Sequence, residues 1–241
     1  MTAKGYQYYQ VEQFPSWELG NKFETQHQDS MFSDVDESPK TVITTVGLSD
    51  NEKFRKYHAL HETYQKVRGR YKNQPINGFI AQMEFHLYYQ PQERILFVDV
   101  QRHFCKEMVE RLHNSNAGIS VNPDEINLVK LGNDLRQNIR GGWFGDLKVA
   151  DVSTIGIFGS TVGESEEWLR YEQIGKLKAI DLRLQMNSME LLVKIMANRG
   201  IVIFENYSEA LSLKFLLEIQ KELDNYRLDT PNDDEEDDNE E

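Results

Sequence analysis

The residues best suited to chemistry in this sequence are the lysines and arginines of one short segment, residues 49–72. Seven basic and three acidic side chains give this segment a charge of +4, in a chain whose net charge is −13. Tyr57, Tyr64 and Tyr71 are interleaved with the basic residues. Cations that contact phosphates, beside rings that stack on bases, are typical of surfaces that bind single-stranded nucleic acid. The candidate binding residues are Lys53, Arg55, Lys56, Lys66, Arg68, Arg70 and Lys72. The alternative is a solvated helix face whose tyrosines point into the core.

Two separated fragments supply a second candidate, which is catalytic. Pro123-Asp124 is followed by Asp146-Leu147-Lys148, and this is similar to the Pro-Asp…Asp/Glu-x-Lys pattern of a large nuclease superfamily. The resemblance implies a metal-dependent nuclease in which Asp124 and Asp146 bind a divalent ion and Lys148 helps to position the attacking water. That family places its first aspartate at the end of a strand. Here Asp124 falls in the first turn of an expected helix, where the helix dipole favours a carboxylate in any case. The nuclease is therefore the alternative function.

Other residues with reactive or metal-binding side chains have simpler structural interpretations. Gly156, Gly159 and Gly163 follow an expected strand, but three glutamates begin the next helix and would repel a phosphate. His58 and His61 are spaced one helical turn apart, yet a metal site needs three or four ligands and the sequence shows no others nearby. We therefore expect no metal site, no cofactor and no catalytic residue.

Composition limits where the protein is expected to act. The chain contains no apolar run of about eighteen residues, so no transmembrane helix is expected. Its polar first residues do not resemble a signal peptide. The single cysteine, Cys105, excludes an internal disulfide and is interpreted as a small core residue. We expect a soluble, cytoplasmic protein that does not contact a membrane.

The C-terminal end of the sequence is a run of acidic residues. Residues 233–241 contain eight carboxylates, and subtracting them leaves −5 for the rest of the chain (−13 + 8). Self-repulsion keeps such a run extended, so residues 229–241 are expected to form a disordered tail. The tail is either a solubility device or a shield that competes with an anionic partner for the basic segment. Because the remainder is mildly acidic, attraction of the whole protein to nucleic acid is not expected.

Hydrophobic periodicity predicts the elements that position these residues. A helix is expected at residues 49–68, where Ser49 and Glu52 form a capping-box pair and apolar residues recur at helical spacing. Further helices are expected at 104–112, 122–139, 166–173 and 208–226. Strands are expected at 5–14, 40–46, 79–89, 94–100, 147–158, 177–186, 189–197 and 200–205.

Consecutive strands followed by a helix predict an α+β fold, mainly antiparallel, with about four to five helices on one face. Residues 1–228 are expected to form a single domain, possibly as two strand-then-helix lobes that meet near 116–122. A doubly wound nucleotide-binding fold is disfavoured because strands do not alternate with crossover helices. We infer a non-catalytic binding, accessory or regulatory protein that has a protein partner. In one version of this inference it also reaches nucleic acid through residues 49–72.

Overall fold

The structure, a computed structural model, describes residues 3–15, 22–26, 39–72, 74–100, 102–114, 119–122, 125–149 and 151–228. Asp124 and the acidic run that begins after Leu228 lie outside the described residues. The expected disorder of that tail therefore stays a prediction.

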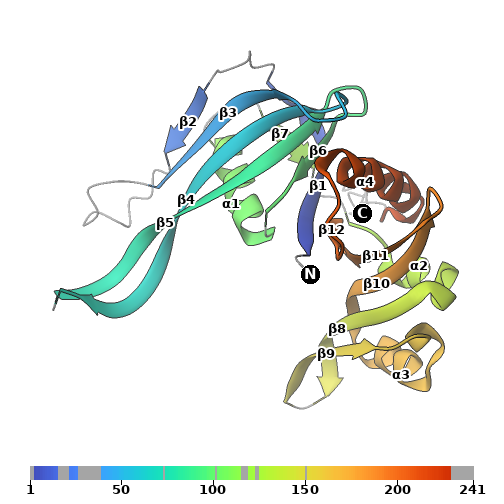
Figure 1. Cartoon of the computed structure of the whole chain (residues 1–241). Helices are drawn as coiled ribbons and strands as arrows, with labels where there is room; N and C mark the ends of the chain where they lie inside the picture. The colour runs from blue at the N-terminus through green and yellow to red at the C-terminus, as the bar shows by residue number, and fades with distance from the viewer. Residues whose placement is uncertain are drawn as a thin grey trace, which may run out of the picture.

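One large antiparallel sheet organises the chain (Figure 1). Its strands follow the order β2-β3-β4-β5-β6-β1-β12-β11-β10-β8-β9, and β7 pairs with β1 outside this path. Because β1 pairs with β6 on one side and with β12 on the other, it joins the two halves of the sheet. The strands are β1 (Lys4–Gln13), β2 (Lys22–Gln26), β3 (Lys40–Leu48), β4 (Arg55–Tyr71), β5 (Gln74–Gln90), β6 (Ile95–Val98), β7 (Ser120–Asn122), β8 (Ile139–Val149), β9 (Val152–Phe158), β10 (Lys176–Met186), β11 (Met189–Met196) and β12 (Gly200–Ile203).

The expected α+β class is wrong, because the described chain is mainly β and its strands form a single sheet. The described residues form four α-helices: α1 (Arg102–Asn114), α2 (Leu128–Asp134), α3 (Glu166–Ile174) and α4 (Glu209–Leu223). Short 3-10 turns occupy Arg136–Asn138, Val162–Glu164 and Asp224–Tyr226. None of the described helices is both long and apolar enough to span a membrane.

The two longest helices cover opposite faces of the sheet, not one face as expected. In β6, Ile95 and Phe97 belong to the buried cluster that contains α4, whereas Leu96 and Val98 belong to the cluster that contains α1. Successive side chains of a strand point to opposite faces, so alternation along β6 separates the two cores. Every side chain of β6 is therefore buried, as expected for a strand whose sequence is continuously apolar.

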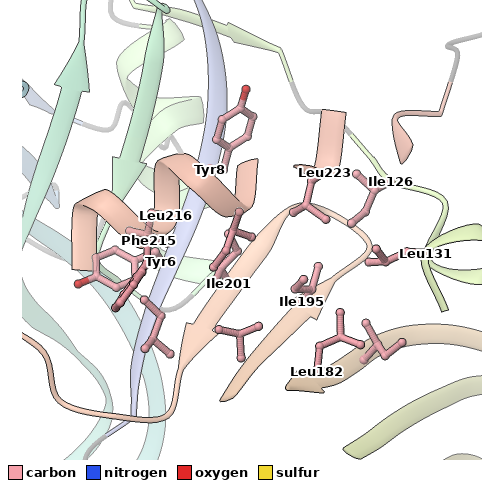
Figure 2. Close-up of a cluster of buried hydrophobic side chains, with 14 of the residues drawn as sticks. Tyr6, Tyr8, Ile126, Leu131, Leu182, Ile195, Ile201, Phe215, Leu216 and Leu223 are labelled. Atoms are coloured by element: carbon pink, nitrogen blue, oxygen red, sulfur yellow. The ribbon is translucent and has the colours of Figure 1, made fainter. Parts of the chain in front are cut away.

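The larger core lies beneath α4 (Figure 2). Phe215 and Leu216 of α4 are fully buried and lie against β1, near Tyr6 and Ile201. Ser208 caps the helix, because its side chain accepts a hydrogen bond from the Leu211 backbone N–H. The expected helix at 208–226 is thus confirmed as a packed element, and the helices expected at 104–112 and 166–173 are confirmed as α1 and α3.

The helix expected at residues 49–68 is wrong, because most of this segment is the long strand β4. Ser49 and Glu52 do not cap a helix. They belong to the β3–β4 turn, in which the Ser49 hydroxyl accepts a hydrogen bond from the Phe54 N–H and Glu52 has a positive φ of 58°. The buried side chains alternate as Tyr57, Ala59, His61 and Thr63, which is the period of a strand.

Two further boundaries differ from expectation. The helix expected at 122–139 is only α2, and Asn127 caps it by accepting a hydrogen bond from the Lys130 N–H at 3.0 Å. The single strand expected at 147–158 is the hairpin β8–β9, with Asp151 at φ 65° in the turn. Gly142 lies inside β8, where the Trp168 ring packs so closely that a Cβ would overlap it.

Candidate nucleic-acid interface

The β4–β5 hairpin extends well beyond the packed part of the sheet (Figure 1). Each strand has 17 residues, which at about 3.3 Å per residue spans roughly 50 Å. Among the residues whose burial the structure describes, Thr63 is the last buried residue of β4 and Phe85 is the first buried residue of β5. The eight residues of β4 beyond Thr63, with the part of β5 that pairs with them, form an arm of roughly 25 Å. We call residues 64–72 and 74–83 the distal hairpin.

The structure divides the seven candidate basic residues into two groups. Lys53, Arg55 and Lys56 lie at the base of the hairpin, where Lys53 and Lys56 are beside α4. The distal hairpin holds the others, Lys66, Arg68, Arg70 and Lys72, all exposed. From Lys56 to Lys66 the strand rises by roughly 33 Å, whereas a helix would have kept them within about 15 Å. The basic segment is therefore not one continuous patch.

At the base of the hairpin, Lys56 stabilises the fold by binding Glu209. Its ammonium group donates a hydrogen bond to Glu209 Oε2 at 2.5 Å, and the Tyr88 hydroxyl donates to the same oxygen at 2.9 Å. Partial burial raises the pKa of Glu209, but the hydrogen bonds from Lys56 and Tyr88 outweigh burial and leave the pKa below its ordinary value. This ionised carboxylate at the first turn of α4 fixes the helix to the hairpin base.

At the tip, a β-bulge directs cations to both faces of the ribbon. Lys66 is opposite Gly78, whereas Arg70 is opposite Pro75, and the register shifts between Lys66 and Gly69. Residues directly opposite each other share a face, and positions 75 and 78, three apart in β5, lie on opposite faces. Lys66 and Arg70 therefore project from opposite faces, which uninterrupted alternation would not allow.

The distal hairpin also exposes aromatic and apolar groups. A Cβ at Gly78 would overlap the Tyr64 ring and lie 2.8 Å from the Gln65 carbonyl oxygen, so the tyrosine lies across the glycine. Phe79 is 49 % exposed and Val67 is 39 % exposed. Sequence reasoning considered Tyr64 but missed Phe79 and Gly78, because it divided the hairpin between a helix and a separate strand. The signal it left unused is that no Asp or Glu occurs between Glu62 and Glu84.

The residues of the nuclease alternative are not brought together among the described residues. Asp146 and Lys148 are both exposed near the end of the β8–β9 hairpin. Asp146 accepts a hydrogen bond of 2.6 Å from Lys178, and this bond holds the pKa of Asp146 below its ordinary value. Asp124 lies outside the described residues, so the metal-dependent nuclease stays an untested prediction.

The histidine pair is separated by the strand. His58 and His61 are three residues apart in β4, so they lie on opposite faces of the sheet. His61 is fully buried, 2.9 Å from the Thr41 hydroxyl, whereas the His58 ring lies 5.6 Å from the His86 ring. In the part of the chain that the structure describes, no three His, Cys, Asp or Glu residues are arranged to hold a metal ion.

Comparisons with known proteins add no family to these observations: no protein-family model and no curated protein matches the chain.

Proposed function

We propose that this protein binds nucleic acid and that the distal hairpin is the contact surface. The observation that carries the proposal is a projecting two-stranded ribbon with four cations and no acidic residue between positions 63 and 83. A two-stranded ribbon is one of the few elements that fit the major groove of duplex DNA, which is about 12 Å wide. Cations on both faces match the phosphates that line the two walls of such a groove.

The acidic body does not prevent this contact. Attraction of the whole protein is opposed by its charge of −13, but screening limits that field to a Debye length of about 8 Å at physiological salt. The arm of roughly 25 Å places its outermost cation, Lys72, about three Debye lengths from the packed part of the sheet. The local positive charge therefore dominates what an approaching phosphate experiences.

The proposal extends to the setting in which the protein works. We propose a cytoplasmic, non-catalytic binding protein, with the acidic body available to a protein partner. A reducing compartment is supported by the presence of one cysteine, Cys105, which leaves no internal disulfide to form; burial raises the pKa of this thiol to about 12 and keeps it unreactive.

Fluorescence anisotropy with a labelled DNA duplex and a labelled single strand tests the proposal. Replacing Lys66, Arg68, Arg70 and Lys72 together by Ala is expected to raise the Kd for duplex at least about tenfold. The matched control removes four exposed lysines elsewhere, Lys106, Lys130, Lys214 and Lys221, and so lowers the net charge equally. Binding that falls equally in both variants contradicts a hairpin site, and so does an absence of binding by the unmodified protein. Tighter binding of the single strand would contradict insertion into a groove.

A further inference from the structure

We propose that two copies of this chain pair through the outer edges of their β9 strands, which makes one continuous sheet across a two-fold axis. The inference goes beyond nucleic-acid binding and rests on different residues. Strand β9 ends the sheet, and among the described residues no strand pairs with its outer side. An exposed edge is a template for another strand unless charge, proline or a covering element protects it.

Strand β9 lacks the usual protection of an edge. Its sequence, Val-Ser-Thr-Ile-Gly-Ile-Phe, contains no charged residue and no proline in seven positions. The strand at the opposite end of the sheet, β2, carries Lys22 and Glu24 within five residues. Because β9 lacks the charged residues that β2 carries, β9 is the edge better suited to pair with a strand of a second copy.

The hydrogen-bonding phase of β9 defines which groups a partner would meet. The Gly159 N–H donates to the Arg140 carbonyl at 3.0 Å, and hydrogen-bonded pairs alternate along an antiparallel ladder. Ile157 and Ile155 therefore bond inward to β8 at Gly142 and Phe144, their partners in the register. The N–H and C=O groups of Thr154, Gly156 and Phe158 consequently point outward.

An antiparallel pair of β9 strands that is symmetric about Ile155 uses those outward groups. Thr154 of one copy then faces Gly156 of the other, so the outward groups of these two residues exchange hydrogen bonds, and Val152 lies opposite Phe158. The same register puts Asp151 opposite Gly159, the residue whose N–H bonds the Arg140 carbonyl.

Apolar surface collects along the same edge. Phe158 is 56 % exposed, Val152 is 42 % exposed and Trp143 of β8 is 36 % exposed. The Phe158 and Trp143 rings are 5.4 Å apart at 74°. A Cβ at Gly141 would overlap the Phe158 ring, so the ring lies inward over β8 and leaves the backbone edge open. Pairing of the two edges would set Val152 of each copy against Phe158 of the other.

Analytical ultracentrifugation across the micromolar range tests this dimer. The unmodified protein is expected to sediment at twice its chain mass of 28.2 kDa. Thr154→Pro removes one outward N–H from each copy and no bond to β8, so the dimer Kd should rise by roughly thirtyfold. Thr154→Ala retains the N–H and should dimerise normally.

A second variant guards against misfolding of the proline variant. Val152→Lys places a charge opposite Phe158 and should also give a monomer, and circular dichroism of both monomeric variants should match that of the unmodified protein. The proposal is overturned if the unmodified protein stays at 28.2 kDa throughout. It is also overturned if Thr154→Pro and Val152→Lys, both folded, remain dimeric.

Discussion

Tyr64 lies across Gly78 on the distal hairpin, so closely that residue 78 has no room for a side chain. A ring that covers a cross-strand glycine protects a backbone that would otherwise be open to water, and it stiffens the exposed ribbon. Stiffness matters at this point because a flexible arm would lose conformational entropy when it docks.

The first prediction concerns this contact. Gly78→Ala should force the Tyr64 ring aside and destabilise the hairpin locally by about 1–2 kcal/mol, with little change in the global free energy of unfolding. Hydrogen exchange should then speed up at amides of residues 64–72. Gly5→Ala is the matched control, because a Cβ there meets nothing closer than Val202 Cγ2 at 3.8 Å. Equal exchange in the two variants would show that Tyr64 does not support the ribbon.

The second prediction is the salt dependence of nucleic-acid binding. If the four tip cations each contact a phosphate, log Kd should change with log salt with a slope of about 3 to 4, or roughly a hundredfold between about 50 mM and about 200 mM salt. Each single substitution, for example Arg70→Ala, should lower the slope by about 1. A slope that does not respond to substitutions at the tip would place the phosphate contacts elsewhere.

The third prediction is a pH dependence of stability from Glu107, which ties α1 to the sheet. Glu107 accepts hydrogen bonds of 2.8 Å from both Thr63 and Arg111, and its carboxylate is 3.7 Å from His61. Partial burial raises the pKa of Glu107, but the contacts with His61, Thr63 and Arg111 outweigh it and lower the pKa overall.

A lowered folded-state pKa stabilises the protein above the ordinary pKa of glutamate, and this contribution is lost as the pH falls through the folded value. Urea unfolding from neutral pH to about pH 3 should therefore show a gap between the unmodified protein and Glu107→Gln that closes in acid. Glu110→Gln, which alters an exposed ion pair on the same helix, should show no such convergence. A gap that is constant across the range would mean that the carboxylate charge plays no part.

The fourth prediction addresses the core beneath α4. Leu216 is fully buried, so Leu216→Ala should lower the free energy of unfolding by about 2–5 kcal/mol. The exposed neighbour Lys214 provides the control, because Lys214→Ala should change it by less than about 0.5 kcal/mol. Chemical denaturation measures both, and a small effect at Leu216 would show that α4 packs loosely.

Sequence patterns correctly predicted the elements whose buried side chains are apolar. They failed for β4, whose buried side chains include polar ones. The apolar arc of α4 and the continuous apolar run of β6 each indicate their environment without help from distant residues. In β4, by contrast, His61 and Thr63 point inward. Other elements supply partners for these residues: Thr41 bonds His61, Glu107 accepts a hydrogen bond from Thr63, and Arg111 donates to both Thr41 and Glu107. No local sequence pattern reveals these contacts.

The candidate site was likewise predicted only in part. The basic residues were recognisable from the sequence, but their distribution was not, because helical spacing fits Tyr57, Leu60 and Tyr64 equally well. Only the pairing of β4 with β5 separates Lys56, which bonds Glu209, from the exposed cations of the tip.

The central place of β1 has a consequence for protein synthesis. Gln7 donates a hydrogen bond of 2.7 Å to the Asn198 carbonyl, 191 positions later. During translation, β1 can therefore pair with β6 and help to bury α1 before β12 has been synthesised. The other edge of β1 stays unpaired during this interval. A nascent chain stalled in that interval presents an unpaired edge and the bare rings of Tyr6 and Tyr8, which makes it a natural target for chaperones.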